Sequence, residues 1–181
     1  MVILLAGASH TGKTLLAQKI LEKCHIPYFS IDHLKMGLIR SGRTALTPQD
    51  DDKLAAYLWP IVKEIVKTAV ENGQNLTIEG VYIPFDWQKD FDGEYLKHIR
   101  YYCLVMTQDY IQMHFSEIKK HADVVEKRLD DSGCSLQSVL KENAENQKMC
   151  GLHGLPCILI EREYATEMTK ELVRLAETLD E

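Results

Sequence analysis

The sequence predicts an α/β fold in which helices cover both faces of a five-stranded parallel sheet. Five β-rich segments alternate with helical segments along the chain, and this alternation is typical of parallel sheets. The first segment, residues 2–6, is a continuous apolar run, as expected for a strand buried on both faces. The length of 181 residues suits a single domain spanning 1–181. Ligands of such sheets bind beyond the carboxyl ends of the strands.

The elements follow from hydrophobic spacing and from residues that begin or end helices. Apolar side chains in residues 12–24 fall on one helical stripe, which predicts a helix directly after the first strand. Thr47 and Pro48 predict the start of a long helix that Pro60 kinks or divides, and Ser135 is expected to cap a later one. The expected strands are residues 2–6, 27–31, 75–79, 99–106 and 156–161. The expected helices are residues 12–24, 33–40, 47–72, 108–120, 135–150 and 163–179.

A phosphate-binding loop is the strongest motif in the chain. Residues 7–14 match GxxxxGK[ST] in full, between an apolar strand and an amphipathic helix, which is the context that the motif requires. The residues expected to contact the nucleotide are Gly7, Ala8, Ser9, His10, Thr11, Gly12, Lys13 and Thr14. The glycines allow backbone N–H groups to point at phosphate oxygens, and the helix that follows adds its positive dipole end. A chance match and a loop that folds without supporting turnover are the alternatives.

The loop predicts ATP and Mg²⁺ as cofactors. Lys13 can reach the β- and γ-phosphates and is a predicted catalytic residue, while the hydroxyl of Thr14 can coordinate Mg²⁺. Glu79 ends the third strand before Gly80 and is a predicted second metal ligand, although a solvated strand-end charge is the alternative. Asp32, after the second strand, is predicted to orient or deprotonate an acceptor. Its alternative role is to cap a helix that starts at His33.

Basic and aromatic residues elsewhere suggest an acceptor pocket and a lid. Arg128, in a basic segment around residues 119–134, is predicted to stabilise charge on the transferred phosphoryl group, with a solvated helix face as the alternative. Arg40 and Arg43 lie in the expected acceptor segment, about residues 33–72, and suggest an acceptor that carries negative charge. Tyr82 can line the same pocket, or it can simply cover the edge of the sheet.

These motifs together resemble the P-loop kinase superfamily of nucleoside-monophosphate-kinase type. The likeness rests on residues 7–14, Asp32, Glu79, the basic segment and the last strand, and it covers essentially the whole chain. Within that group the chain is similar to small bacterial kinases of the adenylate kinase-like or 2-phosphoglycerate kinase-like kind, with zeta-toxin and chloramphenicol phosphotransferase as more distant relatives. The resemblance implies a sheet order of 2-3-1-4-5, MgATP as donor, a closing lid and an adenine site near residues 161–162.

The composition narrows the function classes. A net charge of −6 does not favour nucleic-acid binding, and no apolar run is long enough to cross a bilayer. Five irregularly spaced cysteines argue against a disulfide framework, and we expect a cytoplasmic protein. A single domain with no long heptad seam suggests a monomer or a weak homodimer. The leading expectation is a kinase that transfers the γ-phosphate of ATP to a hydroxylated or phosphorylated metabolite. A nucleoside or nucleotide kinase and a non-catalytic ATP-binding regulator are the alternatives, and no Asn-Lys-x-Asp guanine motif occurs.

Overall fold

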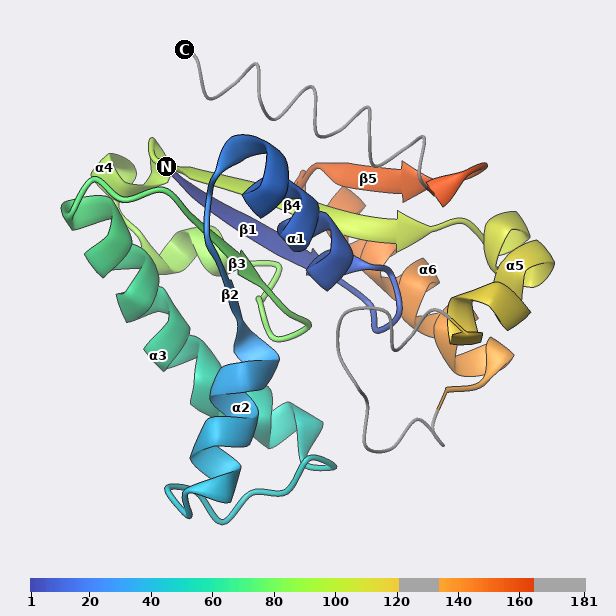
Figure 1. The fold of residues 1–181 in the computed structure, drawn as a ribbon, viewed down its shortest axis with the longest axis horizontal. Helices are drawn as coiled ribbons and strands as arrows, with labels where there is room; N and C mark the ends of the chain where they lie inside the picture. Colours follow the sequence, from blue (N-terminus) through green and yellow to red (C-terminus); the bar gives the residue numbers. More distant parts are fainter. Residues whose placement is uncertain (121–133, 165–181) are drawn as a thin grey trace.

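The computed structural model describes residues 1–120 and 134–164, which form a parallel β-sheet covered by helices (Figure 1). The five strands are β1 (Val2–Gly7), β2 (Tyr28–Ser30), β3 (Leu76–Glu79), β4 (Ile99–Met106) and β5 (Cys157–Ile160). They pair in parallel in the order β2-β3-β1-β4-β5, which confirms the predicted order. β1 therefore lies at the centre of the sheet, where both of its faces are buried.

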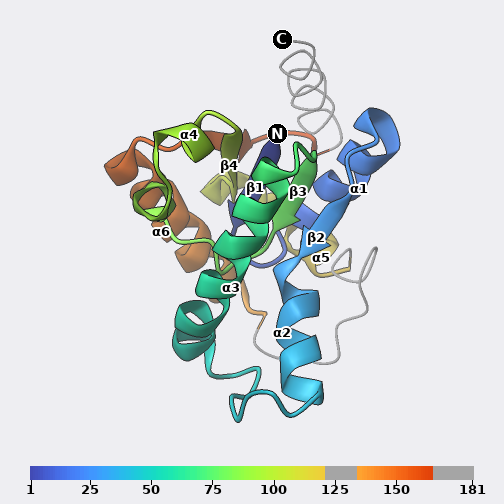
Figure 2. The ribbon, with the colours of Figure 1, turned by 90° about the vertical axis from the view of Figure 1, so that its left-hand side faces the viewer.

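Helices cover the two faces of this sheet. Their bounds are α1 (Lys13–Cys24), α2 (Ile31–Arg40), α3 (Asp51–Glu71), α5 (Gln108–Lys120) and α6 (Leu136–His153). Side chains of β1 alternate between two apolar clusters, with Leu4 packing towards α3 and Leu5 packing towards α1 and α5. Figure 2 shows α6 and α1 on opposite sides of the strands. This burial on both faces explains the continuous apolar run at the start of the chain.

Two predicted helix starts are wrong. The long helix α3 begins at Asp51 rather than near Thr47, because the Thr47 backbone N–H and hydroxyl both donate to the Asp50 carboxylate, at 2.9 and 2.8 Å. These hydrogen bonds hold the pKa of Asp50 at about 2. Pro60 does not divide the helix, which continues as one element to Glu71. Helix α2 begins at Ile31 directly after the three-residue strand β2, two residues earlier than predicted.

The predicted Ser135 cap is confirmed, and the segment between β3 and β4 holds two short helices that were not predicted. Ser135 and Ser138 form a reciprocal capping box at the start of α6. A 3₁₀ helix, η1 (Trp87–Asp90), and a short helix, α4 (Gly93–Leu96), lie between β3 and β4. Trp87 is buried and stacks on Tyr101 of β4 at 5.9 Å between ring centroids. This aromatic packing anchors the segment that follows β3.

Candidate functional site

The phosphate loop follows β1, and its first residue has a backbone conformation that favours glycine. Gly7 has φ of +139°, and a Cβ atom there would lie 2.5 Å from the carbonyl oxygen of Leu104. A side chain would therefore collide with the backbone of β4, the neighbouring strand. Residues 8–12 then connect β1 to α1, which begins at Lys13.

Side chains within the loop bind its own backbone. The Thr11 hydroxyl donates to the Ala8 carbonyl at 2.9 Å, and the Lys13 ammonium donates to the same oxygen at 2.7 Å. Thr11 is fully buried and Lys13 is 7% exposed. The lysine, which is the first residue of α1, is thus held against the loop backbone. A loop of this shape, at the positive end of a helix, binds phosphate through backbone N–H groups and the lysine.

The end of the loop is packed against a residue far away in the sequence. Gly12 has φ of +78°, and a Cβ atom there would lie 1.9 Å from the Tyr164 hydroxyl. That hydroxyl donates to the Gly12 carbonyl oxygen at 2.9 Å, across 152 positions of sequence. Gly12 is therefore required for two reasons, its left-handed backbone and the room that Tyr164 occupies. The sequence reasoning did not find Tyr164.

The acceptor-side carboxylate Asp32 follows β2 as predicted, but it lies within the first turn of α2 rather than before the helix. Ser30 occupies the N-cap position, so the alternative that Asp32 caps the helix is wrong. The Asp32 carboxylate forms an ion pair with Lys35 one turn later. Lys35 is 15% exposed, and its spacing of three residues from Asp32 is the signal that could have identified it.

A buried tyrosine continues this pair towards α3. The Lys35 ammonium lies 3.3 Å from the Tyr82 hydroxyl, which donates to the Asp51 carboxylate at 2.7 Å. Burial, reinforced by the hydrogen bond to Asp51, raises the pKa of Tyr82 far above its ordinary value, so the phenol stays protonated. Asp32, Lys35, Tyr82 and Asp51 thus form one network, the acceptor-side network, which joins α2, α3 and the segment after β3. Asp51 carried no signal in the sequence pattern.

Glu79 lies at the carboxyl end of β3, as predicted. It pairs with Leu5 of β1 on one side and Ser30 of β2 on the other, so these three residues form one row across the sheet. Adjacent strands are separated by about 4.8 Å, which puts the backbones of Leu5 and Ser30 about 10 Å apart. From this row β1 enters the phosphate loop and β2 enters α2. The loop, Glu79 and Asp32 therefore converge on one edge of the sheet, as predicted.

Among the described residues, the predicted arginines Arg40 and Arg43 do not lie at this edge of the sheet. Arg40 and Arg43 are exposed near the far end of α2. Eight residues of helix put the Arg40 backbone about 12 Å from that of Asp32. Arg128 and nearly all of the predicted lid, residues 119–134, lie outside the described residues. Contacts of the arginines with an acceptor thus stay predictions.

The oxygen donors at this edge suit Mg²⁺. Thr14 is partly buried in the first turn of α1, and Glu79 is 2% exposed at the end of β3. Mg²⁺ prefers oxygen ligands and keeps several waters, so a hydroxyl and one carboxylate together with phosphate oxygens are a sufficient set. Among residues 1–120 and 134–164, no cluster of three or more His, Cys, Asp or Glu could hold a metal ion on its own.

Solved structures of small kinases share this architecture over nearly their whole length. Shikimate kinase from Bacteroides thetaiotaomicron matches with a TM-score of 0.61 at 12% identity, covering 100% of this chain and 99% of its own. The chain has the fold of the small P-loop kinases. Deoxyadenosine kinase from M. mycoides matches at 0.57 with 11% identity, covering 98% of this chain and 100% of its own. A gluconokinase from Sinorhizobium meliloti 1021 matches at 0.54 with 16% identity, covering 98% and 94%.

The resemblance inferred from the motifs is thus confirmed at the level of the fold. No protein-family model matches the chain, and no curated protein matches it. The three kinases above act on three different kinds of acceptor by their names, so the fold leaves the acceptor open. No helix in the described part of the chain is both long and apolar enough to cross a membrane.

Proposed function

We propose that the protein is an ATP-dependent phosphotransferase that moves the γ-phosphate of ATP to a small hydroxylated or phosphorylated metabolite. One observation carries the proposal: a complete phosphate loop and the Asp32–Lys35 pair lie at the same edge of a sheet with the small-kinase fold. A donor site and a carboxylate that can receive a proton are the two parts that phosphoryl transfer to a hydroxyl needs.

The residues have separate roles in this proposal. Backbone N–H groups of residues 8–13 and the Lys13 ammonium hold the β- and γ-phosphates, and Lys13 leaves the Ala8 carbonyl to do so. Asp32 accepts the proton of the acceptor hydroxyl, while Lys35 holds the carboxylate in place. Thr14 and Glu79 would hold Mg²⁺, which supplies charge neutralisation on the phosphates when bound. Arg128 is proposed to stabilise the transferred group.

The proposed compartment is the cytoplasm, where ATP is plentiful. All five cysteines are free thiols, which suits a reducing environment. The proposal includes a small-molecule acceptor, no nucleic-acid or membrane partner, and a monomeric or weakly dimeric protein, as the net charge of −6 and the single domain suggest.

A metabolite-library screen tests the proposal. The purified protein is incubated with MgATP and pools of metabolites, and mass spectrometry detects ADP and a product heavier by one phosphoryl group. Transfer to a sugar, acid or phosphorylated metabolite supports the leading assignment, and transfer to a nucleoside or nucleotide supports the alternative kinase class. Tight ATP binding with no product in any pool would support a non-catalytic regulator and overturn the proposal.

A further inference from the structure

The Tyr164 hydroxyl forms a hydrogen bond with the phosphate loop across 152 positions of sequence. Tyr164 follows β5, at the far edge of the sheet from β2, and its ring packs on the apolar cluster beneath α1 and α5. Its hydroxyl donates to the Gly12 carbonyl, which also accepts the first helical hydrogen bond of α1, from the Leu16 N–H at 2.9 Å. Two donors therefore converge on one carbonyl oxygen.

The geometry of the peptide unit gives this contact a consequence for phosphate binding. The Gly12–Lys13 peptide is planar and trans, so its C=O and N–H groups point in opposite directions. Donors that hold the Gly12 oxygen on the helix side therefore aim the Lys13 N–H towards the open end of α1. That is where backbone N–H groups of such loops receive phosphate oxygens.

The surroundings of the phenol keep the contact in place. Burial raises the pKa of Tyr164 well above its ordinary value, so the hydroxyl remains a donor throughout the physiological range. A Cβ atom on residue 12 would occupy the position of this hydroxyl, so glycine at that position permits the contact as well as the turn. The side chain of Tyr164 thus fills the space that the absent side chain of Gly12 leaves beside the loop.

We infer that Tyr164 is a positioning residue for the nucleotide: its hydroxyl holds the Gly12–Lys13 peptide in the orientation that receives the phosphates of the donor. The inference rests on the proposed function for its ligand, a nucleoside triphosphate, but the structural part of it concerns the loop alone. Tyr164 does not touch the reacting atoms, and it acts through the backbone of the loop.

The Tyr164→Phe variant tests the inference because it removes only the hydroxyl and keeps the ring. We expect affinity for MgATP to fall about tenfold, as for the loss of one hydrogen bond, and affinity for inorganic tripolyphosphate to fall by a similar factor, both measured by calorimetry. The matched control is Tyr95→Phe, which removes a hydroxyl that donates to Glu71 at 2.5 Å, far along the sheet from the loop. It should bind both ligands as the wild type does. Weaker MgATP binding with unchanged tripolyphosphate binding would place Tyr164 at the base or ribose and overturn the inference.

A second measurement does not depend on any ligand. Amide hydrogen exchange of the nucleotide-free protein, read in peptides spanning residues 7–14, should be several-fold faster in Tyr164→Phe and unchanged in Tyr95→Phe. Equal exchange in wild type and Tyr164→Phe would overturn the inference whether or not the protein transfers phosphate. Faster exchange in a protein that binds no nucleotide would support the positioning of the loop and refute the proposed function instead.

Discussion

The Lys35 ammonium lies 3.3 Å from the Tyr82 hydroxyl and 5.2 Å from the centre of its ring, although 47 positions of sequence separate the two residues. The same ammonium pairs with Asp32, and the phenol donates onward to Asp51. One cation thus links the carboxylate proposed to receive the acceptor proton with a buried tyrosine anchored to α3. Because the lysine is held from two sides, its position is better defined than that of an exposed lysine.

Replacing Lys35 with Met should therefore impair transfer without impairing nucleotide binding. The Asp32 carboxylate loses the group that orients it, and we expect kcat to fall on the order of tenfold to 100-fold. Affinity for MgATP, measured by calorimetry, should stay within twofold of the wild type. The matched control is Lys67→Met, since Lys67 also pairs with an acid three residues away on a helix, Glu64, but away from the site. Equal losses in both variants would show that Lys35 acts only through stability.

Asp32→Asn should separate binding from chemistry. The amide cannot accept the proton of an acceptor hydroxyl, so turnover should fall about 100-fold or more, while MgATP binds as before. Steady-state kinetics with the acceptor identified by the screen, together with calorimetry, provide the two readouts. If transfer persists at the wild-type rate, Asp32 is not the base, and the proposed division of roles at this edge is wrong.

Lys13→Ala should abolish productive nucleotide binding. The ammonium is buried and donates to the loop backbone, so its removal takes a positive charge away from the phosphate-binding loop. We expect a loss of transfer of about 100-fold to 1,000-fold, as for other groups that stabilise developing charge. Because the lysine also binds the Ala8 carbonyl, thermal unfolding should be followed in parallel. Unaltered affinity and turnover would refute its assignment.

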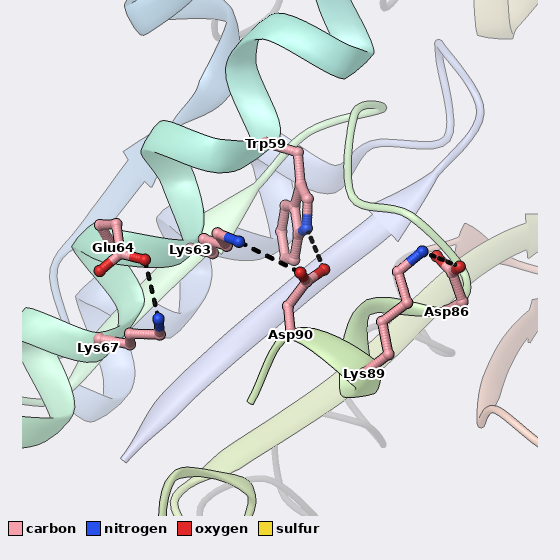
Figure 3. A network of polar contacts seen from close by, with 7 residues as sticks. All are labelled: Trp59, Lys63, Glu64, Lys67, Asp86, Lys89 and Asp90. Atoms are coloured by element: carbon pink, nitrogen blue, oxygen red, sulfur yellow. Dashed lines mark hydrogen bonds and ion pairs between the residues drawn. The ribbon is translucent and has the colours of Figure 1, made fainter. Parts of the chain in front are cut away.

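Because of Asp90, the stability of the protein should depend on pH in the acidic range. Figure 3 shows its carboxylate between Trp59 and Lys63, which donate to it at 2.8 and 3.3 Å. The indole N–H, and then the ammonium, lower the pKa of Asp90 below its ordinary 3.8. Since the folded-state pKa is lowered, the stabilisation is fully present above about pH 4 and is lost as the pH falls through the folded-state value.

Denaturant unfolding of Asp90→Asn measures this contribution. At pH 7 the free energy of unfolding should fall by about 1 kcal/mol, because the amide still accepts a hydrogen bond but lacks the negative charge that strengthens it. The difference from the wild type should shrink as the pH drops below 4. Asp86→Asn is the control, because Asp86 and its partner Lys89 are both exposed, and such exposed pairs contribute little to stability. A difference that does not depend on pH would contradict this assignment.

Much of the fold could be predicted because its signals are local. The run of apolar residues in β1, the spacing of α1 and the Ser135 cap each depend on a few neighbouring residues, and the structure confirms them. The starts of α2 and α3 were misplaced because competing local interactions decide them. Thr47 donates to Asp50 instead of capping a helix, and the short pairing of β2 with β3 releases the chain at Ile31.

The sequence alone determines the phosphate loop, the place of Glu79 at a strand end, the place of Asp32 after the second strand, and the alternation of strands and helices. Tertiary structure decided the partners of these residues. The hydrogen bonds from Tyr164 to Gly12 and from Tyr82 to Asp51 join positions 152 and 31 residues apart. Such contacts depend on how whole elements pack, which no local spacing encodes. The loop motif is thus a property of eight consecutive residues, whereas its positioning depends on a residue that follows the last strand.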